Sequence, residues 1–437
     1  MLSGEARARR GNARAGPVGG NGLRRAPRVT ANSMAVSETK RNLRVLCSYH
    51  FVAFIPWGIF FPYLPLYFQR CGRGDAEIGS LLALPPLLMI LSPPIWGAAA
   101  DRLGDKKRVL LITLGVSALV FPLFWFGRSF AAAMAVMAAF ALFFVPSEPL
   151  ANAITMENLP RAGGDYGKIR LWGSLGFIFP LLFMGLALGP TTGAGADVGS
   201  MAPMFVLYAA FGLLVLAWAT RLPSAHEVRT GGLDWRALRV LARGQFAIFA
   251  LCALVWRVGT LGLFIFFSIY LDRLGMGDNL KGYFWAIGVI SEVVVMYFAG
   301  RIMARTSIKW LFAISLVASA VRLFAFSFPL SFAAIAAVAP LQGIAFAAFH
   351  IPAVTYVNQT VPPHLRASGQ SLLVAFVWGV GGVIGAQLSG AIADEIGVFG
   401  LFRVMSYVVL AALVVFVALF RPQKPAAPED TSDAVPS

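Results

Sequence analysis

Residues 66–79 read LYFQRCGRGDAEIG, and residues 269–282 read IYLDRLGMGDNLKG. The second stretch repeats much of the first at a constant offset of 203 residues. The matched pairs are Tyr67 and Tyr270, Arg70 and Arg273, Gly72 and Gly275, Gly74 and Gly277, Asp75 and Asp278, and Gly79 and Gly282. The same offset also pairs Gly97 with Gly300, Arg102 with Arg305, Pro149 with Pro352, and Pro160 with Pro363. A gapless match over this length indicates two duplicated halves.

The composition is that of a membrane protein. Of the 437 residues, 58% are hydrophobic and only 13% are charged, whereas soluble chains are about 45–50% apolar. Many apolar runs reach about 20 residues, the length with which a helix crosses the hydrocarbon core. These runs do not alternate apolar and polar residues as membrane strands do. We therefore expect an all-α polytopic membrane protein, embedded in a lipid bilayer.

Twelve spans are expected, six in each half. They cover residues 45–68, 78–100, 109–127, 130–153, 168–188, 203–220, 245–271, 281–301, 309–328, 331–356, 369–392 and 399–420. Residues 45–220 then form an N-terminal six-helix bundle, and residues 245–420 form a C-terminal one. Residues 221–244 form the linker between them. We expect residues 1–44 to be a disordered basic segment, with Met34 as an alternative start, and residues 421–437 to be a tail.

The basic residues indicate the topology. The net charge is +16, but the positive charge follows alternate loops instead of forming one nucleic-acid-binding surface. Only six Lys or Arg fall in one set of loops: Arg70, Arg73, Arg128, Arg273, Lys281 and Arg403. By the positive-inside rule these loops are external, and both termini, the linker and the tail are cytoplasmic. We expect an inner-membrane protein that works as a monomer and binds no nucleic acid.

The loop after the second span reads GAAADRLGDKKR, residues 97–108. It resembles the signature G-x-x-x-D-R-x-G-x-[RK]-[RK] of the major facilitator superfamily. The resemblance implies a gating role for this loop: Gly97 allows close helix packing, Gly104 allows the turn, and Asp101 caps a neighbouring helix and pairs with basic residues. It extends that role to Arg102 and Lys106.

Within the superfamily, two further stretches resemble the phenylpropionate permease group. They are DYGKIRLWGSLGF (165–177) and GYFWAIGVISEV (282–293). Arg322 and His350 also fall where that group carries Arg and His. The lactose permease group is a more distant relative, which uses a Glu, an Arg and a His on spans eight to ten for proton coupling. That group has a second Glu one turn beyond the His, where this chain has Ala353.

Glu292 is the only charge in the apolar run from Gly282 to Gly300. A charge at the centre of a bilayer costs about 2.5–3.5 kcal/mol on insertion scales, so such a residue usually faces a cavity or a partner. At about 1.5 Å per residue, Glu292 lies near the midplane, where transporter sites lie. Glu292 is therefore predicted to carry protons. The alternative is a static ion pair with Arg322 or Arg257 that only holds helices together.

Other residues complete the predicted site. Arg322 and His350 are assigned to proton coupling with Glu292. Arg257 lies too far inside span seven to reach the interface and is assigned to substrate binding. Glu148 and Arg170 are expected to meet as a first-half counterpart, beside a helix made irregular by prolines. The aromatic substrate-binding candidates are Trp285, Trp57 and Tyr63.

These features predict a secondary transporter, namely a proton-coupled importer of a small organic solute that works by alternating access. Buried arginines favour an aromatic or other organic acid as the substrate. A sugar or nucleoside symporter and a drug or metabolite exporter are the alternatives. The sequence contains no metal-ligand cluster, nucleophile elbow or phosphate loop, so neither an enzyme nor a cofactor or metal is expected.

Overall fold

The computed structural model describes residues 28–162, 166–193, 196–223 and 236–421, and these ranges contain helices and no strand. The first half is built from α1 (Arg28–Arg70), α2 (Asp75–Leu82), α3 (Leu84–Leu103), α4 (Lys106–Val120), α5 (Phe130–Phe144), α6 (Ser147–Ala162), α7 (Tyr166–Leu188) and α8 (Ala202–Ala219). After α9 (Arg236–Leu241), the second half is built from α10 (Gly244–Arg273), α11 (Asp278–Tyr297), α12 (Ala299–Arg305), α13 (Ile308–Phe326), α14 (Phe332–Val338), α15 (Leu341–Thr360), α16 (Arg366–Val374) and α17 (Gly381–Leu419). Short turns are η1 (Phe121–Trp125), η2 (Val198–Met201), η3 (Pro363–Leu365) and the π turn η4 (Ala375–Val380).

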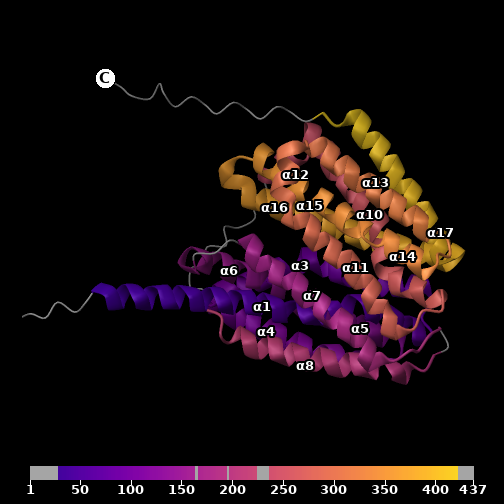
Figure 1. Ribbon diagram of the computed structural model, residues 1–437, viewed down its shortest axis with the longest axis horizontal. Coiled ribbons are helices and arrows are strands. Elements are labelled where there is room, and N and C mark those ends of the chain that lie inside the picture. The colour runs from indigo at the N-terminus through magenta and orange to yellow at the C-terminus, as the bar shows by residue number, and fades with distance from the viewer. Residues whose placement is uncertain (1–27, 163–165, 194–195, 224–235, 422–437) are drawn as a thin grey trace, which may run out of the picture.

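The helices form two groups that follow chain order. Helices α1 to α8, indigo to magenta in Figure 1, occupy one side of the molecule, and α10 to α17 occupy the other. One cluster of buried apolar side chains includes Phe60 of α1 and Phe416 of α17, so the two groups share a continuous apolar core. Helices suit a lipid environment because each satisfies its own backbone hydrogen bonds.

Eleven helical stretches among the described residues are long and apolar enough to cross a membrane. Ten of them correspond to the first ten predicted spans. The last is Pro363–Leu419, 57 residues long, and it has a break at Gly397, whose φ of 74° and ψ of 170° are not helical. This break lies between the predicted spans 369–392 and 399–420, so it supports the prediction of two spans there.

The prediction for the N-terminal segment is partly wrong. Residues 1–44 were expected to lack structure, yet α1 begins at Arg28. Helix extension adds a hydrogen bond for each residue once a nucleus exists, so the polar segment can continue the helix that the first span nucleates. Residues 1–27, most of the linker (224–235) and nearly all of the tail (422–437) lie outside the described residues.

Duplicated glycines mark two places where the halves come very close. Gly79 of α2 packs so tightly on α17 that a Cβ there would collide with the Ala386 carbonyl oxygen. Its repeat partner, Gly282 of α11, packs in the same way against the Leu181 carbonyl of α7. The repeat therefore places helix α2 on α17 and helix α11 on α7 in a pseudo-symmetric arrangement.

Candidate functional site

A cavity of about 440 Å³ lies between the halves and is lined by side chains from both. This volume is in the range of small-molecule sites. Most of its lining is aromatic or aliphatic, and five residues are charged. The charged ones are Glu148, Arg170, Arg257, Glu292 and Arg322. All five were predicted from the sequence, and the fold brings them to one space.

The first-half carboxylate stands at a break in the fourth span. Helix α5 ends at Phe144, and α6 begins at Ser147, just after Pro146. Proline lacks the backbone donor that a continuous helix needs, so the irregularity predicted here is present. Glu148 lies in the first turn of α6, where the helix dipole favours a negative charge. The break thus turns this carboxylate toward the cavity.

Arg170 of α7 links the charges of the two halves. Its Nη2 lies 3.6 Å from Oε1 of Glu148, which is the predicted first-half contact. Its guanidinium also lies 4.2 Å from the centre of the Phe54 ring, a cation–π distance. Arg170 is close enough to Glu292 and His350, both from the second half, to interact with them electrostatically. This long-range coupling was not predicted.

The two second-half arginines have aromatic neighbours and no carboxylate partner among the described residues. The guanidinium of Arg257 lies 4.3 Å from the ring centre of Trp378, which the π turn η4 presents to the cavity. The guanidinium of Arg322 lies 5.6 Å from the ring of Phe326. In both arginines the Nε is buried and has no hydrogen-bond partner. Two guanidiniums therefore face the cavity with unused donors.

Glu292 does not form the ion pair that was considered as the alternative to proton coupling. Among the described residues it contacts neither Arg257 nor Arg322 in a salt bridge, although all three line the same cavity. Each arginine is instead held against an aromatic ring of its own half. The static-pair alternative therefore does not describe this structure.

The remaining site candidates divide into two groups. Trp285 and Trp57 line the cavity, and Trp285 is held by a 2.9 Å hydrogen bond from its Nε1 to Oγ of Ser268. His350 stacks on the cavity residue Phe346, with ring centres 5.6 Å apart. His350 is not itself a lining residue of the cavity. Tyr63 is fully buried in the apolar core and is not a lining residue, so the structure gives its predicted role no support.

The predicted gating loop is only partly organised as expected. Gly104 ends α3 in the left-handed conformation, with φ 63°, as a turn there requires. Nothing lies within 4 Å of a Cβ built on Gly97, so the expected close packing is absent from this conformation. At the start of α4 the helix cap is Asp105, whose side chain accepts a hydrogen bond from the backbone N–H of Lys107.

Two more loop residues have different surroundings. Lys106 pairs with Glu157 of its own half, with Nζ to Oε2 at 3.2 Å. Arg102 is exposed at the end of α3. The pair joins α4 to α6 within the first half, and the salt bridges between described residues of the two halves lie at the other end of the molecule.

At that other end, two reciprocal ion pairs join the halves. Arg70 of the first half binds Asp278 of the second, with Nη1 to Oδ2 at 2.6 Å. Arg273 of the second half binds Asp75 of the first, with Nη2 to Oδ2 at 2.8 Å. Since Arg70 repeats as Arg273 and Asp75 as Asp278, one duplicated motif supplies both pairs. We call these two pairs the external latch, because they lie next to loops that the charge pattern predicts to be external.

The latch lies partly in a buried charge cluster. Lys281 pairs with Asp278 and with Asp272, each at 2.6 Å, and Arg70 lies 3.7 Å from Asp272. The side chains of Arg70, Asp278 and Lys281 are 0% exposed. Two cations thus balance two anions out of contact with water. The repeat contained the signal for these residues, but their pairing was missed because only the fold shows that the two copies meet.

The comparisons with known proteins agree with this architecture. A family model described as the MFS_1 like family matches residues 43–404. The chain is 27% identical over 358 residues to YegT of Escherichia coli (strain K12), whose name places it among nucleoside transporters, covering 79% of this chain and 83% of YegT. It is 28% identical to a probable 3-phenylpropionic acid transporter of the same organism, over 64% of this chain and 73% of that one. The crystal structure of the nucleoside transporter NupG has the same fold, with a TM-score of 0.75 at 20% identity over 87% of this chain and 99% of NupG.

Proposed function

The chain belongs to the MFS_1 like family, which makes it a multi-pass membrane transporter and not an enzyme, and we propose that it imports a small aromatic carboxylate together with protons by alternating access. The substrate would occupy the cavity between the halves. Movement of the halves would expose that cavity to one side of the membrane at a time, as in other transporters built from repeats.

The two unpaired guanidiniums carry the proposal of an anionic substrate. Arg257 and Arg322 face one cavity, have unused Nε donors and lack a carboxylate partner among the described residues. A buried cation without a counter-ion is costly, and a carboxylate on the substrate would supply the missing charge. The aromatic walls, which include Trp57 and Trp285, suit an aromatic ring attached to that carboxylate.

Glu292 supports proton coupling. It is a carboxylate within a predicted span, it lines the cavity, and no salt bridge among the described residues holds it in the charged form. Such a group can take up a proton while the cavity faces one side and release it on the other. Neutralising Glu292 would lower the cost of moving the loaded carrier through the membrane. His350 and Arg322 are the other two second-half residues that we assign to proton coupling.

A neutral nucleoside is the second candidate substrate. Relatives named for nucleoside transport are similar to this chain, and Glu148 and Gln342 of the cavity offer hydrogen bonds to hydroxyl groups beside rings that can stack on a base. Transport of a sugar, and export of the substrate instead of import, are both compatible with the same fold. The choice between these substrates depends on whether Arg257 and Arg322 need an anionic partner.

The orientation belongs to the same proposal. We place the external latch on the outer face of the inner membrane and both termini in the cytoplasm, because the loops at the opposite end hold most of the Lys and Arg. In this orientation the structure is closed outward. A single chain contains both halves and the cavity, so we propose that the monomer is the working unit.

Uptake into proteoliposomes tests the proposal. Purified protein would be given arylalkanoic acids, nucleosides and maltose, each with and without an inside-alkaline pH gradient. We expect accumulation of an aromatic acid that the gradient drives. Nucleoside uptake with no uptake of any acid would select the second candidate, and accumulation that ignores the pH gradient would contradict proton coupling.

A further inference from the structure

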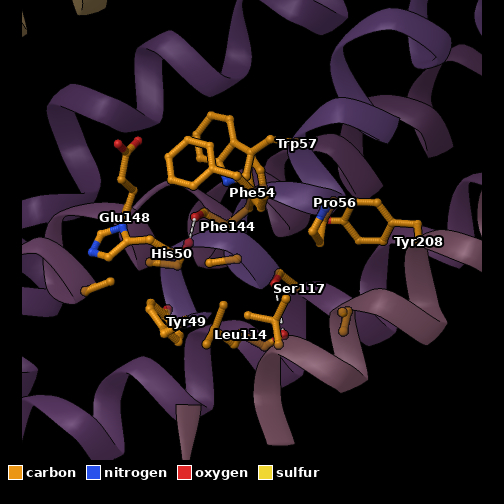
Figure 2. A pocket seen from close by; sticks show the side chains of 16 residues that line it. Tyr49, His50, Phe54, Pro56, Trp57, Leu114, Ser117, Phe144, Glu148 and Tyr208 are labelled. Atoms are coloured by element: carbon orange, nitrogen blue, oxygen red, sulfur yellow. Dashed lines mark hydrogen bonds between the residues drawn. The ribbon is translucent and has the colours of Figure 1, made fainter. Parts of the chain in front are cut away.

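A second, smaller pocket lies inside the first half, beside the central cavity (Figure 2). It has a volume of about 30 Å³ and is lined by residues of α1, α4, α5, α6 and α8. Four residues line both spaces, namely Phe54, Trp57, Phe144 and Glu148. A water needs about 10–15 Å³ of such space, so the pocket has room for one or two waters but not for an organic substrate.

His50 of α1 is a buried histidine that lines this pocket, and the proposed transport function does not use it. It is 1% exposed, and its Nε2 lies 3.0 Å from Oγ1 of Thr155. The hydroxyl of Thr155 itself donates to the carbonyl oxygen of Ala151 at 2.8 Å. A hydroxyl has one proton, and we assign it to the contact with Ala151, so that Thr155 accepts from His50. The proton of the neutral imidazole is therefore on Nε2.

The other ring nitrogen is left without a partner. With Nε2 protonated, Nδ1 of His50 holds a free lone pair, and it is buried and forms no hydrogen bond among the described residues. A buried polar atom in this condition usually binds a water or has a functional role. The pocket offers acceptors for such a water, because the hydroxyls of Ser117 and Ser147 already donate to backbone carbonyls.

The charged and titratable neighbours come from three helices and from α1 itself. Glu148 of α6 lines the pocket, and in Figure 2 its side chain lies on the same side as His50, opposite Tyr208 of α8. Arg170 of α7 is close enough to act on His50 electrostatically. Tyr49 of α1 also lines the pocket, and α4 contributes only uncharged residues.

We propose that this pocket is a second proton-binding site, in which Nδ1 of His50 takes up the proton and a water connects it to the carboxylate of Glu148. The inference rests on the proposed proton coupling and adds a residue to it. The proton arrives from cavity water and leaves by the same route, so no other reactant is needed.

Protonation of His50 would also change the ion pairs around the cavity. The imidazolium would share the carboxylate of Glu148 with Arg170, which now pairs with Glu148 at 3.6 Å. Arg170 would then be freer to act on Glu292 across the halves, since the two already interact. A proton on His50 is thereby communicated to the second half through one guanidinium.

Nitrogen-15 magnetic resonance on histidine-labelled full-length protein in lipid nanodiscs tests the site directly, with the proton as the only ligand. The chain has four histidines, and His50→Gln assigns the signal. At high pH we expect neutral His50 with its proton on Nε2, and on acidification a proton on Nδ1. A His50 that stays neutral between about pH 4 and pH 9, or that carries its neutral proton on Nδ1, would overturn the proposal.

A matched pair of variants tests the tautomer argument. Thr155→Ser keeps the hydroxyl and should keep the Nε2 proton, whereas Thr155→Val removes the acceptor and should give a mixture of tautomers. Identical spectra for the two variants would refute the assignment. Because these spectra need no transport, the assignment holds or fails separately from the proposed import.

Transport adds the functional comparison. In His50→Gln we expect accumulation driven by a pH gradient to fall at least about tenfold, while exchange of substrate at equal pH on both sides is kept, since exchange needs no net proton movement. Unchanged gradient-driven accumulation in His50→Gln would overturn the role of His50 in coupling. A wild-type protein that shows no proton-driven uptake at all would instead refute the proposed function.

Discussion

The external latch should stabilise the outward-closed state relative to the outward-open state, and this can be tested. Replacing Asp278 by Asn removes the carboxylate that binds both Arg70 and Lys281. The buried cluster then has two cations and only Asp272 as an anion. Opening the external end would let water reach the unbalanced charge, so the Asp278→Asn variant should favour the outward-open state.

The size of the shift follows from burial. Removing one partner of a buried ion pair costs about 3–5 kcal/mol, and about 1.4 kcal/mol changes an equilibrium tenfold. Even about 3 kcal/mol would raise an outward-open population of about 1% to about half. The repeat-related change Asp75→Asn should have a smaller effect, because Arg273 is 33% exposed and exposed pairs contribute about 1 kcal/mol or less.

Pulsed electron paramagnetic resonance can measure this shift. Spin labels at Arg128 and Pro329, which are exposed residues of opposite halves in loops predicted to be external, should move apart in Asp278→Asn. Glu77→Gln is the control, because Glu77 pairs with Arg73 of its own half at the same end. Adding Lys281→Gln to Asp278→Asn restores charge balance and should restore much of the closed state. Equal distance distributions in the wild type and Asp278→Asn would refute the latch.

Three further changes separate the roles of single residues. Glu292→Gln should abolish the stimulation of uptake by a pH gradient while substrate exchange persists, and full stimulation in this variant would contradict its role. Arg322→Gln should weaken uptake of an aromatic acid about 10- to 100-fold, the loss of a charged hydrogen bond, whereas the exposed Arg128→Gln should not. Gly282→Val should hinder external closure because its side chain meets the Leu181 backbone, while Gly300→Val, with nothing within 4 Å of its Cβ position, should leave the label distances unchanged.

The spans could be predicted from the sequence because crossing a membrane is a local requirement of length and apolarity. The prediction failed where tertiary structure or helix cooperativity decides the outcome. Helix α1 extends back to Arg28 because extending an existing helix is easier than starting one. The break at Gly397, by contrast, lies between two predicted spans. A glycine can adopt the positive φ that this break requires.

The cavity charges could also be predicted, because a charge inside an apolar run is costly and usually faces a cavity or a partner. The partners of these charges could not be predicted. The alternative considered for Glu292 was an ion pair with a second-half arginine, but its electrostatic neighbour Arg170 comes from the first half. His350 was selected from the resemblance to the phenylpropionate permease group, whereas His50, which also lies within a predicted span, was not selected. The sequence gives no sign of the contact with Thr155 that fixes its tautomer.

The repeat separates the residues that close the protein from those that occupy its cavity. The latch residues and the contact glycines obey the offset of 203, so both copies of the ancestral motif still form the same interface. The five cavity charges do not obey it. At their repeat-related positions stand Ile351 for Glu148, Leu373 for Arg170, Phe54 for Arg257, Met89 for Glu292 and Leu119 for Arg322. Closure of two halves requires matching surfaces, whereas binding one asymmetric substrate and a proton requires different groups on its two sides. The charges that break the repeat are therefore those we expect to determine substrate and coupling, and the charges that keep it are those we expect to determine the conformational state.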